Sequence, residues 1–202
     1  MIIIGITGPT GAGKTTALNE LEKLGGVIID CDAVYHELLK SNKTLQEELQ
    51  KRFGVLTDEN GVFDRKKLGA VVFRDPAALQ DLNAIAHRHV VVAVKQILEK
   101  AQGDHIPAAA IDAIALFESG LAQLCQATVA ITAPAGIRVE RIMAREGISR
   151  QYAQSRVDAQ NPEEFYTSRC DHVLRNDCAS AAEFGARARA LFAMLLARNG
   201  KH

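Results

Sequence analysis

The chain has 202 residues, of which 48% are hydrophobic and 24% are charged, and these proportions favour one folded domain and exclude a globally disordered chain. Its 24 Lys and Arg residues balance 24 Asp and Glu residues, and this zero net charge argues against a general nucleic-acid-binding protein, which usually carries a basic excess. The four cysteines form no C-x-x-C pair, and glycine, glutamine and proline interrupt the uncharged stretch 119–137. We therefore expect a cytoplasmic protein with reduced thiols and no membrane-spanning segment.

The first element in chain order is an apolar run at residues 2–7, which predicts a short buried strand. Residues 8–15 then read Gly-Pro-Thr-Gly-Ala-Gly-Lys-Thr, a full match to G-x-x-x-x-G-K-[ST] between a strand and a helix. In such a loop the backbone N–H groups surround a phosphate, Lys14 reaches the β- and γ-phosphates, and the hydroxyl of Thr15 can ligate Mg²⁺. A chance glycine turn is the alternative, but the complete match favours a nucleoside triphosphate site.

Apolar runs that end at Asp30, at Asp112 and at Thr132 predict three more strands. Helical periodicity covers the segments 77–100, 137–146 and 181–198. Strands separated by helices and long connections predict an α/β fold, namely the three-layer P-loop NTPase fold with a parallel sheet. Ligands bind at the carboxyl ends of such strands, so we expect the loop and the two aspartates to converge on one crevice.

We expect a single kinase domain that spans residues 1–202 and carries two additions to the sheet. A helical insertion at about 36–103 would bind the acceptor substrate, and a lid at about 138–170 would close over the nucleotide. The core would consist of residues 1–35, 104–137 and 171–202. Three phenylalanines of the insertion are expected to be core residues: Phe53, Phe63 and Phe73.

A phosphate loop alone does not distinguish a kinase from a GTPase, a motor or a transport ATPase. Guanine-specific GTPases carry N-K-x-D on a later strand, and the nearest sequence here, Asn-Lys-Thr-Leu at residues 42–45, lacks the aspartate. A small-molecule kinase needs a carboxylate near the acceptor hydroxyl, and Asp30-Cys31-Asp32 supplies two at the end of the second strand. Asp32 could instead cap a helix, because aspartate is a favoured N-cap residue.

Two further features point to phosphoryl transfer. Asp112 ends an apolar strand, which is the usual position of a magnesium-binding aspartate in P-loop proteins. Arg141 and Arg145 are four residues apart, so they share one helix face, from which a lid could clamp nucleotide phosphates.

Blocks of sequence along nearly the whole chain resemble those of the dephospho-CoA kinase family. They lie at residues 5–15, 24–32, 52–54, 60–65, 82–87, 116–121, 141–145, 156–160 and 171–176. Each block is weak alone, but their order and spacing together are specific. The resemblance implies transfer of the γ-phosphate of ATP, with Mg²⁺, to the ribose 3′-hydroxyl of dephospho-CoA, the last step of coenzyme A biosynthesis.

The resemblance also implies roles for individual residues. Those that would bind ATP are Thr10, Gly11, Ala12, Gly13, Lys14, Thr15, Arg145 and Asn176. The catalytic residues would be Asp32 as general base, with Lys14 and Arg141 on the transferring phosphoryl group. Those that would face the acceptor are Asp30, His87 and Glu118. Taken alone, His87 would be read as a packed or surface histidine and Glu118 as part of a first helical turn.

The chain departs from the family pattern mainly on the acceptor side. Arg88 replaces the usual proline after His87, Ile114 stands at another usual proline, residues 165–168 lack the usual basic side chains, and Cys31 occupies the centre of the aspartate box. Two alternatives therefore stay open: a kinase for another small acceptor, such as a nucleoside, nucleotide or sugar acid, and a regulatory protein that binds ATP without catalysis. We expect a monomer or weak homo-oligomer with no nucleic-acid partner.

Overall fold

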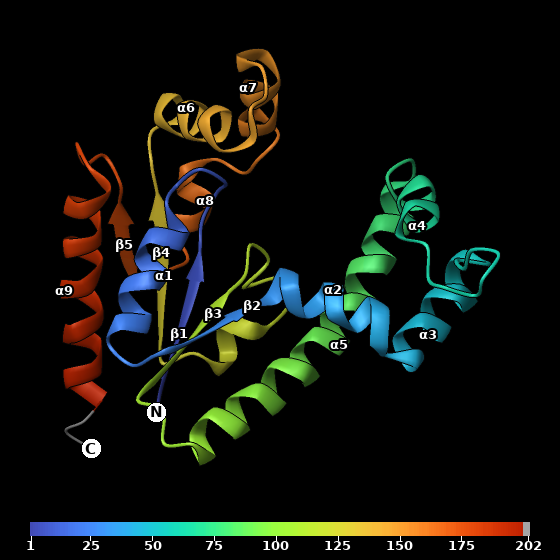
Figure 1. Ribbon diagram of the computed structural model, residues 1–202, viewed down its shortest axis with the longest axis horizontal. Coiled ribbons are helices and arrows are strands. Elements are labelled where there is room, and N and C mark those ends of the chain that lie inside the picture. Colours follow the sequence, from blue (N-terminus) through green and yellow to red (C-terminus); the bar gives the residue numbers. More distant parts are fainter. Residues whose placement is uncertain (200–202) are drawn as a thin grey trace. The chain divides into compact units, whose positions relative to one another are not determined.

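A computed structural model describes residues 1–199 of the chain, and its internal contacts divide it into two units (Figure 1). Unit 1 contains Met1–Ile29 and the chain from Glu99 onward, and unit 2 contains Asp30–Leu98. Among the described residues, no helix has both the length and the apolar character that a membrane span requires.

A five-stranded sheet with the strand order β2-β3-β1-β4-β5 forms the centre of unit 1. The strands are β1 (Ile2–Thr7), β2 (Val27–Asp30), β3 (Ala108–Asp112), β4 (Ala127–Thr132) and β5 (His172–Arg175). β1 pairs in parallel with β3 and with β4, in a register that sets Ile4 opposite Ala110 and Ala127. A central strand covered on both faces needs apolar side chains at successive positions, which explains the continuous apolar run of β1. The predicted α/β fold with a parallel sheet is confirmed.

Helices cover this sheet and extend beyond its carboxyl edge. They are α1 (Lys14–Lys23), the 3-10 helix η1 (Leu121–Leu124), α6 (Ala135–Glu146), α7 (Arg150–Asp158), α8 (Glu163–Thr167) and α9 (Ala181–Asn199). Figure 1 shows α1 and α9 side by side, and the two helices contact each other. Phe184 and Phe192 of α9 are fully buried in one core with Leu21 of α1 and with Ile4 and Ile6 of β1. α6 and α7 also pack together, around a smaller apolar cluster.

Unit 2 is built from helices with a core of their own. They are α2 (Cys31–Ser41), α3 (Lys43–Phe53), α4 (Arg65–Val72) and α5 (Pro76–Gly103), whose last residues belong to unit 1. Leu39 of α2, Leu45 and Leu49 of α3, and Leu68 and Val72 of α4 form the centre of the core. These leucines recur at helical spacing, so each helix buries one face against the others.

Each of the three shorter helices of unit 2 is capped at its N-terminus by the side chain of the residue that precedes it. Oδ1 of Asp30 accepts hydrogen bonds from the N–H groups of Asp32 and Ala33 at 2.9 and 3.0 Å, at the start of α2. Asn42 and Asp64 cap α3 and α4 in the same way. The alternative reading of Asp32 as a helix cap is therefore wrong, because Asp30 is the cap and Asp32 lies in the first turn.

The three phenylalanines expected in the core have different surroundings. Phe53 and Phe63 pack against the core of unit 2, as predicted, whereas Phe73 is 81% exposed. Successive residues of a helix are rotated by about 100°. Leu68 and Val72 are buried in the core, whereas Phe73, directly after Val72, is exposed at the end of the helix. The prediction that Phe73 is a core residue is wrong.

Replacing Phe192 by alanine should lower the free energy of unfolding by about 3–5 kcal/mol, because the fully buried ring leaves a cavity between α9 and the sheet. Urea unfolding followed by circular dichroism measures this loss. Met194→Ala, at an exposed position of the same helix, is the matched control and should stay within about 0.5 kcal/mol of the wild type. A loss below about 1 kcal/mol for Phe192→Ala would contradict this description of the core.

Candidate functional site

The phosphate loop joins β1 to α1 and depends on glycine where the backbone takes left-handed torsions. Gly8, Gly11 and Gly13 have φ angles of +141°, +81° and +105°. A Cβ on Gly8 would lie 2.0 Å from the carbonyl oxygen of Ile131, and one on Gly13 would lie 2.3 Å from Nδ2 of Asn176. Glycine at these positions lets the loop turn its N–H groups inward. Gly13 at the N-cap leaves the first turn of α1 open to an anion.

Two side chains, one from α6 and one from the segment after α7, hold the start of the loop. The guanidinium of Arg138, a residue only 7% exposed, donates to the carbonyl oxygen of Thr10 at 2.9 Å and to Oε1 of Gln160. The same Oε1 accepts a hydrogen bond from the N–H of Thr10 at 3.1 Å. Burial lowers the pKa of Arg138, but arginine stays protonated in proteins, so the loop begins against a fixed positive charge.

A second pair of side chains holds the middle of the loop. Arg141 donates through Nη1 to the carbonyl oxygens of Gly11 and Ala12, each at 3.3 Å, and through Nη2 to Oδ1 of Asn176 at 3.0 Å. Asn176 follows β5, is 4% exposed, and donates from Nδ2 to the carbonyl oxygen of Ala12 at 2.9 Å. Both polar atoms of the Asn176 amide thus bond to the protein, and its place near the adenine stays a prediction.

A cavity of about 190 Å³ lies over the loop. Its lining residues come from the loop, from the end of β3 and from α6: Pro9, Thr10, Gly11, Gly13, Lys14, Thr15, Asp112, Arg141 and Arg145. The structure therefore brings together residues that the sequence assigned separately to phosphate binding, to a metal and to a lid. Pockets for whole ligands usually measure roughly 300–1,000 Å³, so this cavity suits the phosphate groups of a nucleotide.

Lys14 and Asp112 face each other in this cavity, with Nζ 3.9 Å from Oδ1. The Lys14 ammonium also donates to the carbonyl oxygen of Gly8 at 3.3 Å. The Thr15 hydroxyl and the Asp112 carboxylate are hard oxygen donors, which suit Mg²⁺ held jointly by protein and phosphate. Within residues 1–199 no group of three or more His, Cys, Asp or Glu side chains could hold a metal.

Two other predicted residues of unit 1 lie in ion pairs. Arg145 is exposed and pairs with Glu146 at 2.6 Å, although it also lines the cavity. Oε1 of Glu118 lies 2.6 Å from Nη1 of Arg169. The Arg169 guanidinium also lies 4.0 Å from the centre of the Phe165 ring. Phe165, at one of the positions where basic residues were expected, thus gives the neighbouring arginine an aromatic face to stack on.

The remaining predicted residues, Asp30, Asp32 and His87, belong to unit 2, whereas the phosphate loop belongs to unit 1. Asp30 caps α2, whereas the carboxylate of Asp32 is exposed and has no hydrogen-bond or ion-pair partner among the described residues. His87 is half-buried in α5. Arg88, beside it, pairs with Glu48 at 3.0 Å. A proline at position 88 would interrupt the hydrogen bonds of a helix interior, so arginine suits the unbroken α5.

Sequence reasoning missed the roles of Arg138 and Gln160. Arg138 lies three residues before Arg141, one turn away on the same face of α6, and that spacing was the available signal. Gln160 gave no such signal, because its partner Thr10 is 150 residues away in the chain and the pair belongs to no local motif.

Replacing Gly13 by alanine should weaken nucleotide binding by about a hundredfold or more, measured by isothermal titration with ATP. The new Cβ would lie 2.3 Å from Nδ2 of Asn176 and would also impose a left-handed torsion that costs about 1–2 kcal/mol. Gly136→Ala in α6 is the matched control, because a Cβ there meets no heavy atom of the described residues within 4 Å. Wild-type affinity in Gly13→Ala would contradict the loop geometry.

Comparison with known proteins gives consistent matches over most of the chain. A family model described as dephospho-CoA kinase matches residues 2–182. A dephospho-CoA kinase of Moorella thermoacetica is 36% identical over 176 residues, which cover 86% of this chain and 83% of the relative. One of Anaeromyxobacter dehalogenans is 34% identical over 192 residues, which cover 95% of this chain and 91% of the relative.

Solved structures agree with these matches. A protein from Thermus thermophilus superimposes with a TM-score of 0.77 at 34% identity, over 96% of each chain. A dephospho-CoA kinase from Campylobacter jejuni, at 24% identity, shares the fold with a TM-score of 0.71 over 98% of each chain. Because the family model spans most of the chain and several relatives exceed 30% identity, the chain belongs to the dephospho-CoA kinase family.

Proposed function

We propose that the chain transfers the γ-phosphoryl group of ATP to the ribose 3′-hydroxyl of dephospho-CoA, which gives coenzyme A and ADP. The use of ATP as phosphoryl donor is supported by the cavity over the phosphate loop, which is lined by Lys14, Thr15, Asp112 and Arg141. The acceptor is inferred from the named relatives, which are dephospho-CoA kinases that this chain matches along most of their length.

On the donor side, the loop N–H groups and the first turn of α1 would bind the β- and γ-phosphates of ATP, with Lys14 as their cation. Arg141 would stabilise the charge on the transferring phosphoryl group. Its guanidinium is already fixed by Gly11, Ala12 and Asn176, so it would need little reorganisation during the reaction. Arg145 would exchange Glu146 for a phosphate, because its present partner is an exposed surface carboxylate.

Thr15 and Asp112 would hold Mg²⁺ together with the phosphates, since both line the phosphate cavity. A bound Mg²⁺ would neutralise charge on the β- and γ-phosphate oxygens. Lys14, which lies 3.9 Å from Asp112, would keep that carboxylate oriented toward the phosphates.

On the acceptor side, Asp32 would accept the proton of the 3′-hydroxyl as it attacks the γ-phosphorus. Of the two carboxylates in the aspartate box, Asp30 has its Oδ1 occupied by the cap of α2, whereas the carboxylate of Asp32 has no hydrogen-bond partner among the described residues. The cap fixes the backbone beneath Asp32 and so restricts where its carboxylate can lie. His87 and Glu118 would take part in acceptor binding.

We also propose that the protein works in a reducing cytoplasm as a monomer or weak homo-oligomer, without nucleic acid. Cys125, Cys170 and Cys178 carry free thiols. Burial raises the pKa of Cys125 to about 12 and that of Cys170 to about 11, so both stay protonated and resist oxidation. This state of the thiols is what a reducing compartment would maintain.

The proposal is tested by measuring ADP release with a panel of acceptors: dephospho-CoA, adenosine, AMP, gluconate and shikimate. Turnover with dephospho-CoA and background rates with the others are expected. Turnover with another acceptor but not with dephospho-CoA would favour a kinase of different specificity. If calorimetry shows ATP binding and none of the acceptors yields ADP, the regulatory alternative holds instead.

Two variants test the proposed chemistry. Asp32→Asn should lower kcat by about 10²–10⁴-fold, because the amide keeps the shape of the side chain but cannot accept the proton. Lys14→Ala should lower kcat by orders of magnitude as well, because it removes the positive charge that would stabilise the phosphates. Glu37→Gln, an exposed position on the same helix as Asp32, is the matched control and should keep wild-type turnover. Near-normal turnover in a folded Asp32→Asn protein would remove the base assignment.

A further inference from the structure

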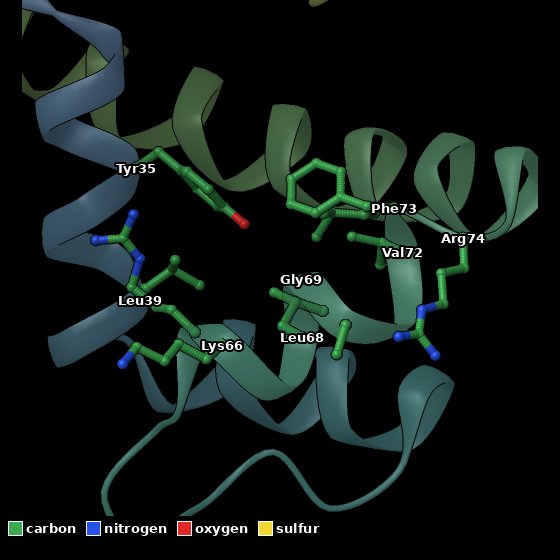
Figure 2. A pocket seen from close by; sticks show the side chains of 11 residues that line it. Tyr35, Leu39, Lys66, Leu68, Gly69, Val72, Phe73 and Arg74 are labelled. Atoms are coloured by element: carbon green, nitrogen blue, oxygen red, sulfur yellow. The ribbon is translucent and has the colours of Figure 1, made fainter. Parts of the chain in front are cut away.

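Each of the two units contains a cavity that suits one side of the proposed reaction. In Figure 2 the side chain of Tyr35 extends from α2 into a cavity of about 850 Å³ among the helices of unit 2, the part of the chain expected to bind the acceptor. The smaller cavity over the phosphate loop, in unit 1, has Arg145 of α6 in its lining. The other two cations of its described lining donate to carbonyl oxygens of the loop, whereas Arg145 pairs with Glu146, a carboxylate outside the lining.

The pairing of Arg145 with Glu146 joins two neighbours in the sequence. Nη2 of Arg145 donates to Oε1 of Glu146 at 2.6 Å. Successive residues of a helix are rotated by about 100°, so neighbours do not face each other, whereas Arg141 and Arg145, four residues apart, share one face. To reach Glu146, the Arg145 side chain bends around the helix, away from the face that Arg141 turns toward the loop. The ion pair therefore occupies a guanidinium that a phosphate in the cavity would attract.

Glu146 has a second partner on the next helix. Arg156 of α7 donates through Nη1 to Oε2 of Glu146, so each carboxylate oxygen accepts from a different guanidinium. The hydrogen bond from Arg145 is the largest of the effects that lower the pKa of Glu146, so the carboxylate is charged at neutral pH. If Arg145 left for a phosphate, Glu146 would still be paired with Arg156 and its charge would stay compensated.

The ion pair is weak enough to be exchanged. The side chains of Arg145, Glu146 and Arg156 are 58%, 29% and 37% exposed. A pair with this much contact with water changes an equilibrium constant by about fivefold at most. A nucleoside triphosphate brings several negative charges to the cavity against the single charge of Glu146, and arginine binds phosphate strongly. The phosphates would therefore win the guanidinium, but at a measurable cost in affinity.

Given the proposed function, we propose that Glu146 competes with the nucleotide phosphates for Arg145 and so tunes the affinity of the donor site. In the free protein Glu146 holds Arg145. When a triphosphate binds, Arg145 moves to a phosphate oxygen and Arg156 keeps Glu146 paired. After the phosphoryl group has left for the acceptor, the cavity holds less negative charge, and Glu146 takes Arg145 back, which favours release of ADP. Glu146 is thus a positioning residue that acts through Arg145.

The first test measures the Kd of ATP in Glu146→Gln by isothermal titration. ATP should bind about two- to fivefold more tightly, because the neutral amide no longer competes for the guanidinium. Glu140→Gln is the matched control, since it removes the same charge from the same helix but releases Arg150, which is not among the described residues that line the cavity. Its Kd should equal that of the wild type. An unchanged or weakened affinity in Glu146→Gln overturns the proposal.

A second test asks whether the effect passes through Arg145. In an Arg145→Ala background, adding Glu146→Gln should leave the Kd of ATP unchanged, because no guanidinium remains to be released. If the affinity rises by the same factor as it does with Arg145 present, removal of a nearby negative charge explains the whole effect, and the proposal is overturned.

These outcomes separate the competition from the function itself, because ATP binding is measured without an acceptor. In turnover, Glu146→Gln should lower the KM of ATP and leave that of dephospho-CoA unchanged, a split that a general structural change would not give. If the wild type turns over dephospho-CoA but its ATP affinity does not respond to Glu146→Gln, the competition fails and the proposed function stands. If the wild type does not turn over dephospho-CoA, the proposed function fails, and ATP binding still decides the competition.

Discussion

The phosphate loop keeps its shape because side chains from distant parts of unit 1 hydrogen-bond to its backbone. A loop that turns its N–H groups toward an anion must turn its carbonyl groups outward, and a buried carbonyl needs a donor. Arg138 supplies one to Thr10, and Arg141 and Asn176 supply theirs to Gly11 and Ala12. The glycines permit the turn, but these outer donors stabilise it against relaxation.

This arrangement ties the loop to the elements beyond it. α6 carries both arginines, the segment after α7 carries Gln160, and Asn176 follows β5, so the anion site is completed only when these parts are folded together. Arg141 would have a double role under the proposed function, because the group that fixes the loop would also meet the transferring phosphoryl group. Preorganised charge of this kind is the main means by which phosphoryl transfer is accelerated.

The parts of the fold that the sequence predicted well are those with local signals. Apolar runs placed four strands, helical periodicity placed α5, α6 and α9, and the motif at residues 8–15 located the loop. Contacts between distant residues were missed, since Gln160 and Thr10 are 150 positions apart. Phe73 was misplaced because hydrophobicity alone does not say which way a residue after a helix points. The acceptor-side roles of Asp32, His87 and Glu118 remain predictions from family resemblance.

Hydrogen exchange of the loop amides in Gln160→Ala tests most directly whether outer side chains hold the loop. Gln154→Ala on α7 is the matched control, because Gln154 bonds only to the nearby Asp158 among the described residues. Exchange in the peptide covering residues 8–16 should be at least about tenfold faster in Gln160→Ala than in the control, with β1 and α9 unchanged. Equal exchange rates in the two variants would show that the loop keeps its shape without these contacts, and would contradict the account.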